Sequence, residues 1–238
     1  PNSVMAVDAV TGRVYWKYRH QNAENALVCC GANNRGVAVL NDKVYMGTLD
    51  AHLVALDRVN GQLLWEAEVG DVNLAYSVTM APLAVKDKIL VGVGGGEFGI
   101  RGYVAAFNAE TGEQAWKTYT IPGPGEANHD SWEGDDWEHG GAPVWITGSF
   151  DPDLNLTYWG VGNPGPDWNA GQRPGDYLYS DSAIALDADT GELKWYFQFT
   201  PHDVHDWDAI QVPILADLNF EGQDRRLMML ANRNAFFY

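Results

Sequence analysis

Long apolar runs are missing from this chain of 238 residues. Apolar stretches such as residues 88–93 and 227–230 fall far short of the roughly 20 residues that a membrane-spanning helix needs. The chain also does not open on the apolar segment of a secretory signal peptide. We therefore expect no membrane span, and the given residues carry no visible targeting signal.

Basic residues are scarce. Lysine and arginine together number 15 against 32 aspartates and glutamates, which gives a formal net charge of -17. Such a surface repels nucleic acid phosphates and anionic lipid headgroups, so we expect no nucleic acid partner. A cationic partner fits better, such as a basic redox protein or a metal ion, although the same charge could serve only to keep the protein in solution.

Cysteine is limited to one adjacent pair, Cys29-Cys30. Neighbouring residues have Cα atoms about 3.8 Å apart, closer than an ordinary disulfide prefers, so a bond between them would close a small, strained ring. That bond would persist only in an oxidising compartment. Two ordinary buried thiols are the alternative that the pair alone leaves open.

Convincing amphipathic helices are absent as well, and what recurs instead is a segment of the form Ala-x-Asp/Asn-x-x-Thr/Asn-Gly-x-x-x-Trp. Its tryptophans are spaced by 49, 51 and 79 residues. Each copy joins strand-like sequence of alternating polarity, and its Asp-x-x-Thr-Gly stretch predicts a tight turn between two strands. The four copies run from Ala6 to Trp16, Ala55 to Trp65, Ala106 to Trp116 and Ala185 to Trp195.

A period near 50 residues with several short strands per unit predicts the blades of a β-propeller. The fold class is therefore all-β, with each repeated tryptophan docking one blade against its neighbour. The 79-residue interval contains an insertion that is rich in glycine, proline and tryptophan. Loops of this kind on a rigid scaffold are where a functional site is expected.

The pair Asp206-x-Asp208 is the first candidate for chemistry. On an extended segment its two carboxylates would lie on one side and could share a cation. Oxygen ligands select hard ions, and further oxygens could come from Glu97 and Asn163. Taken alone, an Asp-x-Asp loop is more often solvated or turn-forming.

Other site classes are disfavoured. The glycines at 94–96 would let the backbone approach a flat ligand, but they lack the spacing and the following helix of a nucleotide-binding loop. His202 and His205 lack further nitrogen or sulfur ligands at zinc-site spacing, so we expect structural roles for them. No serine or cysteine motif supplies a candidate for nucleophilic catalysis.

Taken together, these motifs resemble the methanol and ethanol dehydrogenases that use pyrroloquinoline quinone (PQQ), and the resemblance covers essentially the whole chain. The motifs that carry it lie at residues 29–36, 95–102, 159–164, 200–208 and 232–234. The family resemblance implies an eight-bladed propeller with PQQ near its axis. Residues 1–238 would then be a single partial domain of about half the blades, cut at both ends.

The resemblance also implies which residues bind PQQ. Cys29 and Cys30 would form the family's ring disulfide over one face of the cofactor, and Trp145 would stack on the other. Aromatic and uncharged polarizable surfaces both suit a planar quinone. Donors to its carboxylates and quinone oxygens would be Arg35, Thr79 and Arg233. The backbone approach would be at Gly95 and Gly96.

For the metal, the resemblance makes Glu97, Asn163 and Asp206 ligands, with Asp206 also the catalytic base. Asp208 resembles the extra acid of the lanthanide-dependent subgroup, whereas calcium enzymes typically have a small residue there. An additional anion beside the other carboxylates and PQQ adds repulsion that a trivalent ion offsets better than Ca²⁺. We therefore expect a lanthanide ion, with Ca²⁺ as the alternative.

The implied reaction is oxidation of a small primary alcohol to an aldehyde, with hydride passing to metal-bound PQQ and electrons leaving singly to a cytochrome c. The segment 177–184 resembles the ethanol-type members and favours a broad range of primary alcohols. The implied location is the periplasm, and a homodimer is compatible with the family.

Three alternatives stay open. A non-catalytic propeller scaffold of the cell envelope would use the same tryptophan-docked repeats without needing the proposed site residues together. A quinohaemoprotein would carry an additional C-terminal haem domain. A sugar-oxidising PQQ propeller is disfavoured by the adjacent cysteines.

Overall fold

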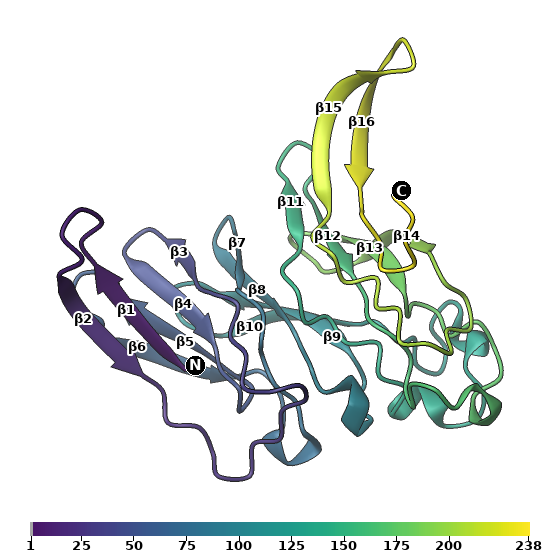
Figure 1. The fold of residues 1–238 in the computed structure, drawn as a ribbon, viewed down its shortest axis with the longest axis horizontal. Helices are drawn as coiled ribbons and strands as arrows, with labels where there is room; N and C mark the ends of the chain where they lie inside the picture. Colours follow the sequence, from purple (N-terminus) through teal and green to yellow (C-terminus); the bar gives the residue numbers. More distant parts are fainter. Residues whose placement is uncertain (1) are drawn as a thin grey trace.

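Four-stranded antiparallel sheets are the repeated unit of this computed structural model, which describes residues 2–238 (Figure 1). In each sheet the strands pair in the order of the sequence. Three such sheets occur within the described residues. They comprise β3 (Ala38–Leu40), β4 (Lys43–Gly47), β5 (His52–Asp57) and β6 (Leu63–Glu68); β7 (Leu83–Val85), β8 (Lys88–Gly92), β9 (Tyr103–Asn108) and β10 (Gln114–Tyr119); and β11 (Ser149–Asp151), β12 (Leu156–Gly160), β13 (Ser182–Asp187) and β14 (Leu193–Gln198).

Two-stranded sheets flank these three. One pairs β1 (Ser3–Val7) with β2 (Val14–Arg19), and the other pairs β15 (Ile214–Phe220) with β16 (Gln223–Met229). Figure 1 shows the sheets following one another across the molecule from β1–β2 to the β15–β16 hairpin. The first strands of neighbouring sheets contact each other, β3 against β7 and β11 against β15. The expectation of an all-β fold built from propeller blades is confirmed.

The repeated motif makes the outer hairpin of each four-stranded sheet and the hairpin of β1 and β2. Between β5 and β6, one carboxylate oxygen of Asp57 accepts the N–H groups of Val59 at 2.7 Å and Asn60 at 2.9 Å. Gly61 closes the turn with a φ of +74°, a conformation that favours glycine. The aspartate and the glycine of the motif therefore set the geometry of the turn locally, before any long-range contact is made.

The tryptophan of each copy docks against the turn of the next copy. The indole N–H groups of Trp16, Trp65 and Trp116 donate to the backbone oxygens of Arg58 at 3.0 Å, Ala109 at 3.2 Å and Ala188 at 3.3 Å. The same rings cover the turn glycines, so that a Cβ on Gly61 would lie 2.5 Å from the ring of Trp16. The predicted docking between blades is confirmed.

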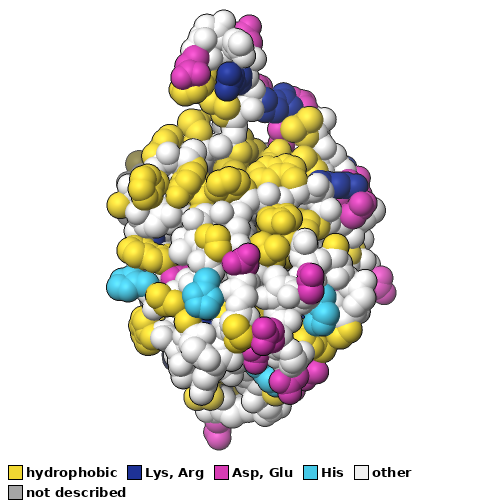
Figure 2. All heavy atoms as spheres, turned by 90° about the vertical axis from the view of Figure 1, so that its right-hand side faces the viewer, with side chains coloured by type: hydrophobic (Ala, Val, Ile, Leu, Met, Phe, Trp, Pro, Cys, Tyr) yellow, Lys and Arg dark blue, Asp and Glu magenta, His cyan; other side chains and the backbone are white. Residues whose placement is uncertain are grey.

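The fourth tryptophan, Trp195, instead faces the surface at the C-terminal side, where hydrophobic side chains gather (Figure 2). Its side chain is exposed, together with those of Phe197, Phe237 and Tyr238. This surface is apolar and aromatic, like the surfaces that the docking tryptophans bury between the earlier sheets.

The predicted insertion forms loops between β10 and β11 and between β12 and β13. These loops contain short 3₁₀ turns, as do the connections nearer the N-terminus. Within the described residues, no helix is long and apolar enough to cross a membrane. The 3₁₀ turns are η1 (Val72–Leu74), η2 (Gly96–Phe98), η3 (His129–Ser131), η4 (Asp136–Glu138) and η5 (Ala170–Gln172).

Candidate cofactor and metal site

A cavity of about 230 Å³ lies where the loops that join the strands and the sheets meet. Its walls come from segments more than 200 residues apart in the sequence. All the predicted site residues line it except Gly96 and Asn163, which are both buried. The predicted residues that line the cavity are Cys29, Cys30, Arg35, Thr79, Gly95, Glu97, Trp145, Asp206, Asp208 and Arg233.

Cys29 and Cys30 are joined by a disulfide, with their Cα atoms 3.8 Å apart. Cys30 is exposed at the cavity and Cys29 is half-buried. The alternative of two buried thiols is therefore wrong, because the pair is oxidised and open to the cavity. The disulfide forms part of the cavity wall.

Arg35 and Trp145 meet across the cavity. The backbone N–H and the guanidinium of Arg35 both donate to the backbone oxygen of Thr79, at 3.0 and 3.3 Å. The Arg35 guanidinium carbon lies 4.7 Å from the centre of the Trp145 ring. A planar aromatic face and a fixed cation are thus presented to the same space.

The segment that carries Asp206 and Asp208 differs from the extended strand that we expected. Both residues have left-handed backbone conformations, with φ of 59° and 52°. The cause is the buried Asp203, whose carboxylate accepts the backbone N–H groups of His205 and Trp207, each at 2.8 Å. These bonds curl the segment, yet Asp206 and Asp208 still reach the same cavity.

Asp208 is the most constrained acid of the site, with 5% of its surface exposed. One carboxylate oxygen lies 2.8 Å from the guanidinium of Arg233. The other accepts the indole N–H of Trp145 at 3.3 Å and the backbone N–H of Asn163 at 3.2 Å. Asp208 therefore links a predicted cofactor donor, the tryptophan that is predicted to stack on the cofactor, and a predicted metal ligand.

Burial raises the pKa of Asp208 to about 7, and the charge of Asp206 adds to the rise while Arg233 opposes it. Burial also raises the pKa of Asp206. Partial removal of its carboxyl group from water raises the pKa of Glu97, and the charges of Asp167 and Asp206 raise it further. The acids raise one another's pKa values, which is the electrostatic condition that a bound cation relieves.

A further buried acid lies behind the cavity. Burial raises the pKa of Asp181 well above its usual value, and the charges of Asp203 and Asp208 add to this effect. Asp181 does not line the cavity, and its carboxylate is fully covered. It extends the group of mutually repelling acids by one member that the sequence reasoning did not identify.

Asp167 was also missed. Its carboxylate accepts the side-chain amide N–H of Asn163 at 2.7 Å, so this bond orients the predicted ligand. The cavity wall contains four more residues that the sequence analysis did not select: Val28, Asn33, Ser77 and Gly94. Asn33 and Gly94 belong to stretches that had been singled out, whereas Ser77 carries no signal in the sequence.

The donor set suits a hard cation and an anionic planar cofactor. Glu97, Asp206 and Asp208 offer carboxylate oxygens, which hard ions prefer. Among the described residues these three carboxylates do not converge as a set to within 4.8 Å, and Asp208 is paired with Arg233. Arg35 and Arg233 are the cations that carboxylates of a cofactor would pair with.

Comparison with known proteins decides the family. The family model described as "PQQ: Glucose/ethanol/alcohol dehydrogenase, beta-propeller domain" matches residues 1–238. The chain belongs to this family.

The relatives of this family member include quinohemoprotein alcohol dehydrogenases and lanthanide-dependent methanol dehydrogenases. The chain is 43% identical to a quinohemoprotein alcohol dehydrogenase, ADH IIB, of Pseudomonas putida. The match covers 99% of this chain and 36% of that protein. It is 40% identical to a lanthanide-dependent methanol dehydrogenase of Methylacidiphilum fumariolicum, over 100% of its own length and 43% of the relative's. The chain thus spans well under half the length of these relatives.

A solved structure of a europium-containing methanol dehydrogenase superposes on the chain with a TM-score of 0.93 at 38% identity. The match covers 99% of this chain and 45% of that one. The propeller fold is therefore shared with a solved member of the family. This coverage agrees with the expectation that residues 1–238 hold about half of such a propeller.

Proposed function

We propose that the full-length protein oxidises small primary alcohols to aldehydes, with PQQ and a metal ion bound in the cavity between Cys29-Cys30 and Trp145. The observation that carries this proposal is the convergence of the disulfide, the tryptophan, two arginines and three acids on one cavity from five separate segments. A scaffold would not need that convergence. Family membership supports the same assignment.

Different residues of this chain would bind the cofactor and the metal. Arg35 and Arg233 would hold the anionic groups of PQQ, while the disulfide and Trp145 would bracket its ring. Glu97, Asn163, Asp206 and Asp208 would surround the metal. When bound, PQQ would supply a two-electron acceptor and the metal a Lewis acid.

Asp206 would take the proton of the substrate hydroxyl. It lines the cavity, and its raised pKa brings it nearer to neutrality, where a general base works best. The charge of Arg233 opposes the rise and helps keep the carboxylate ionised. Asp206 therefore combines access to the cavity with a suitable proton affinity.

We propose a lanthanide as the metal, with Ca²⁺ as the alternative, because Asp208 adds a third carboxylate to a site where the acids already repel one another. A trivalent ion compensates this repulsion more completely. Electrons would leave to a basic cytochrome c in the periplasm, a partner that the net charge of -17 favours. A homodimer is compatible with this arrangement.

The test is alcohol-dependent dye reduction by the full-length protein reconstituted with PQQ and either La³⁺ or Ca²⁺, alongside Asp208→Ala. Turnover with La³⁺ that is lost in the variant supports the proposal. Turnover with Ca²⁺ alone would overturn the role of Asp208. No turnover and no bound quinone absorbance with either metal would favour the envelope scaffold.

A second candidate function is that of a quinohaemoprotein, in which a haem domain accepts the electrons within the same protein. The observation that favours it is the 43% identity to the quinohemoprotein of Pseudomonas putida. A haem absorbance in the purified full-length protein would separate the two, because the simple quinoprotein has none.

A further inference from the structure

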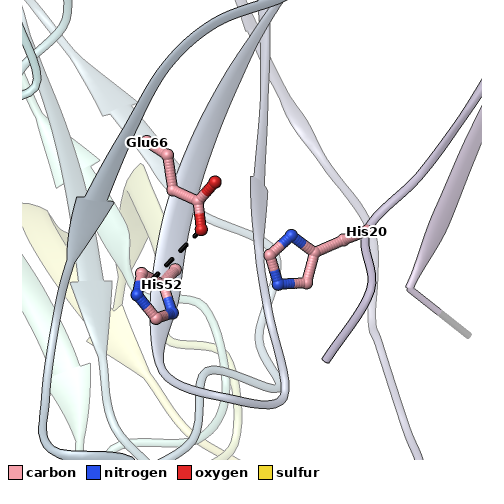
Figure 3. A group of neighbouring side chains, drawn as sticks. All are labelled: His20, His52 and Glu66. Atoms are coloured by element: carbon pink, nitrogen blue, oxygen red, sulfur yellow. Dashed lines mark ion pairs between the residues drawn. The ribbon is translucent and has the colours of Figure 1, made fainter. Parts of the chain in front are cut away.

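A second group of ligand-type side chains lies outside the cofactor cavity, between the first two sheets (Figure 3). His20 follows β2, His52 begins β5 and Glu66 lies on β6. One ligand atom of each residue lies within 4.8 Å of the others. Figure 3 shows the two imidazole rings and the carboxylate turned toward a common space.

Asp50 bonds one nitrogen of each imidazole. Its carboxylate oxygens both lie 3.0 Å from Nε2 of His20, and its backbone oxygen accepts from Nδ1 of His52 at 2.9 Å. Nδ1 of His20 and Nε2 of His52 therefore remain as ligand atoms, and the latter lies 4.0 Å from the Glu66 carboxylate. Carboxylates and carbonyls that fix the far nitrogen of a histidine are the usual support of metal-binding imidazoles.

Asp50 is itself fixed. Its side chain is 5% exposed and accepts the Thr48 hydroxyl at 2.6 Å and the Ala23 backbone N–H at 2.9 Å. This fixed carboxylate thus orients His20, whose own side chain is 8% exposed.

The repeats within this chain show that the blade framework does not require these residues. At the same distances from the motif tryptophan, the other copies carry side chains that differ in kind. They place Ser3, Tyr103 and Ser182 at the position of His52; Lys17, Lys117 and Tyr196 at that of Glu66; and Val69, Thr120 and Phe199 at that of His20.

We propose that His20, His52 and Glu66 form a binding site for a divalent transition-metal ion of the zinc class, which joins the first sheet to the second. Two imidazole nitrogens and one carboxylate oxygen leave a fourth position for water, an arrangement that zinc accepts. Tetrahedral ligands of zinc lie roughly 3.4 Å apart, so small side-chain movements complete the site. His52 and Glu66 can make them, since their side chains are 29% and 34% exposed.

The ligand chemistry separates this site from the cofactor cavity. Imidazole suits zinc, copper and nickel, whereas Ca²⁺ and lanthanides prefer oxygen ligands alone. The ion would bridge the segment that leaves β2 to the edge hairpin β5–β6. An ion that binds only the folded arrangement raises its stability.

The experiment is a Zn²⁺ titration by calorimetry of the full-length, tag-free protein with PQQ and its own metal already bound. We expect one Zn²⁺ per chain, with affinity lowered at least tenfold in Glu66→Gln and in His52→Gln. The control Glu113→Gln removes an exposed acid from another hairpin and should leave the affinity unchanged. With the metal bound, the thermal midpoint should rise in the wild type and not in the two variants.

The visible spectrum of bound Co²⁺ tests which side chains bind the metal. Co²⁺ in the same site should give the visible absorption of a nitrogen-ligated tetrahedral ion, and Glu66→Gln should alter that spectrum. Absence of Zn²⁺ uptake, or equal affinity in the wild type and both ligand variants, would overturn the proposal. The glutamine variants keep the size of the side chain at partly exposed positions, so folding is preserved for the comparison.

Discussion

Asp208 should make metal binding in the cavity depend on pH, and Asp208→Asn should remove that dependence. Because burial raises its pKa to about 7, the metal-free carboxyl carries a proton below that pH. A cation must displace this proton, so about nine-tenths of a proton is released from Asp208 at pH 6, about half at pH 7 and about one-tenth at pH 8. The corresponding part of the affinity falls about tenfold for each pH unit below 7.

The sign for stability follows from the same shift. A carboxyl whose folded pKa is raised stabilises the fold while it is protonated, and this contribution is lost as the pH rises from 3.8 to about 7. The increase in the pKa of Asp208 corresponds to at most about 4 kcal/mol of folding free energy at this buried position. The metal-free Asp208→Asn protein should therefore lose less stability than the wild type between pH 5 and pH 8.

The assay is La³⁺ titration by calorimetry at pH 6, 7 and 8 in buffers of different ionisation enthalpy, which yields the number of protons released. The wild-type protein should release more protons than Asp208→Asn at pH 6, and the difference should fall to about one-tenth of a proton at pH 8. Equal proton release by the two proteins at pH 6 would refute the reasoning, because Asp208 would then be ionised before the metal binds.

Three further predictions concern the blades and the proposed base. Trp116→Ala should lower the free energy of unfolding by about 3–5 kcal/mol, measured by denaturant unfolding, because its buried ring docks two sheets. Gly61→Ala should destabilise more than Gly12→Ala in the same assay: both glycines have positive φ, but only at Gly61 would the new Cβ meet Trp16. A smaller effect at Gly61 would contradict the docking role. Asp206→Asn should reduce kcat about 10²- to 10⁴-fold while the quinone absorbance is retained, and unchanged kcat would exclude it as the base.

The blade structure could be predicted because its signal is local. The Asp57 turn bonds and the Gly61 conformation lie within five residues, so one copy of the motif specifies one hairpin. The repetition then predicted the docking of each tryptophan on the next copy. The curl at Asp206 and Asp208 could not be read in the same way, since it depends on the buried carboxylate of Asp203.

The cavity was predicted through family resemblance more than through local pattern. Cys29 and Arg233 lie at opposite ends of the chain, and no spacing rule brings them together. Contacts that depend on packing escaped the sequence analysis, such as the pair of Asp208 with Arg233 and the bond of Asn163 to Asp167. Such contacts arise only when separate loops meet above the sheets.

The most direct test of the central claim is a crystal structure of the full-length protein with PQQ and La³⁺, with the lanthanide located by its anomalous scattering. Planar density between the Cys29-Cys30 disulfide and Trp145, with an anomalous peak beside Glu97, Asp206 and Asp208, is the predicted result. A cofactor bound elsewhere, or an anomalous peak distant from these acids, would contradict the account.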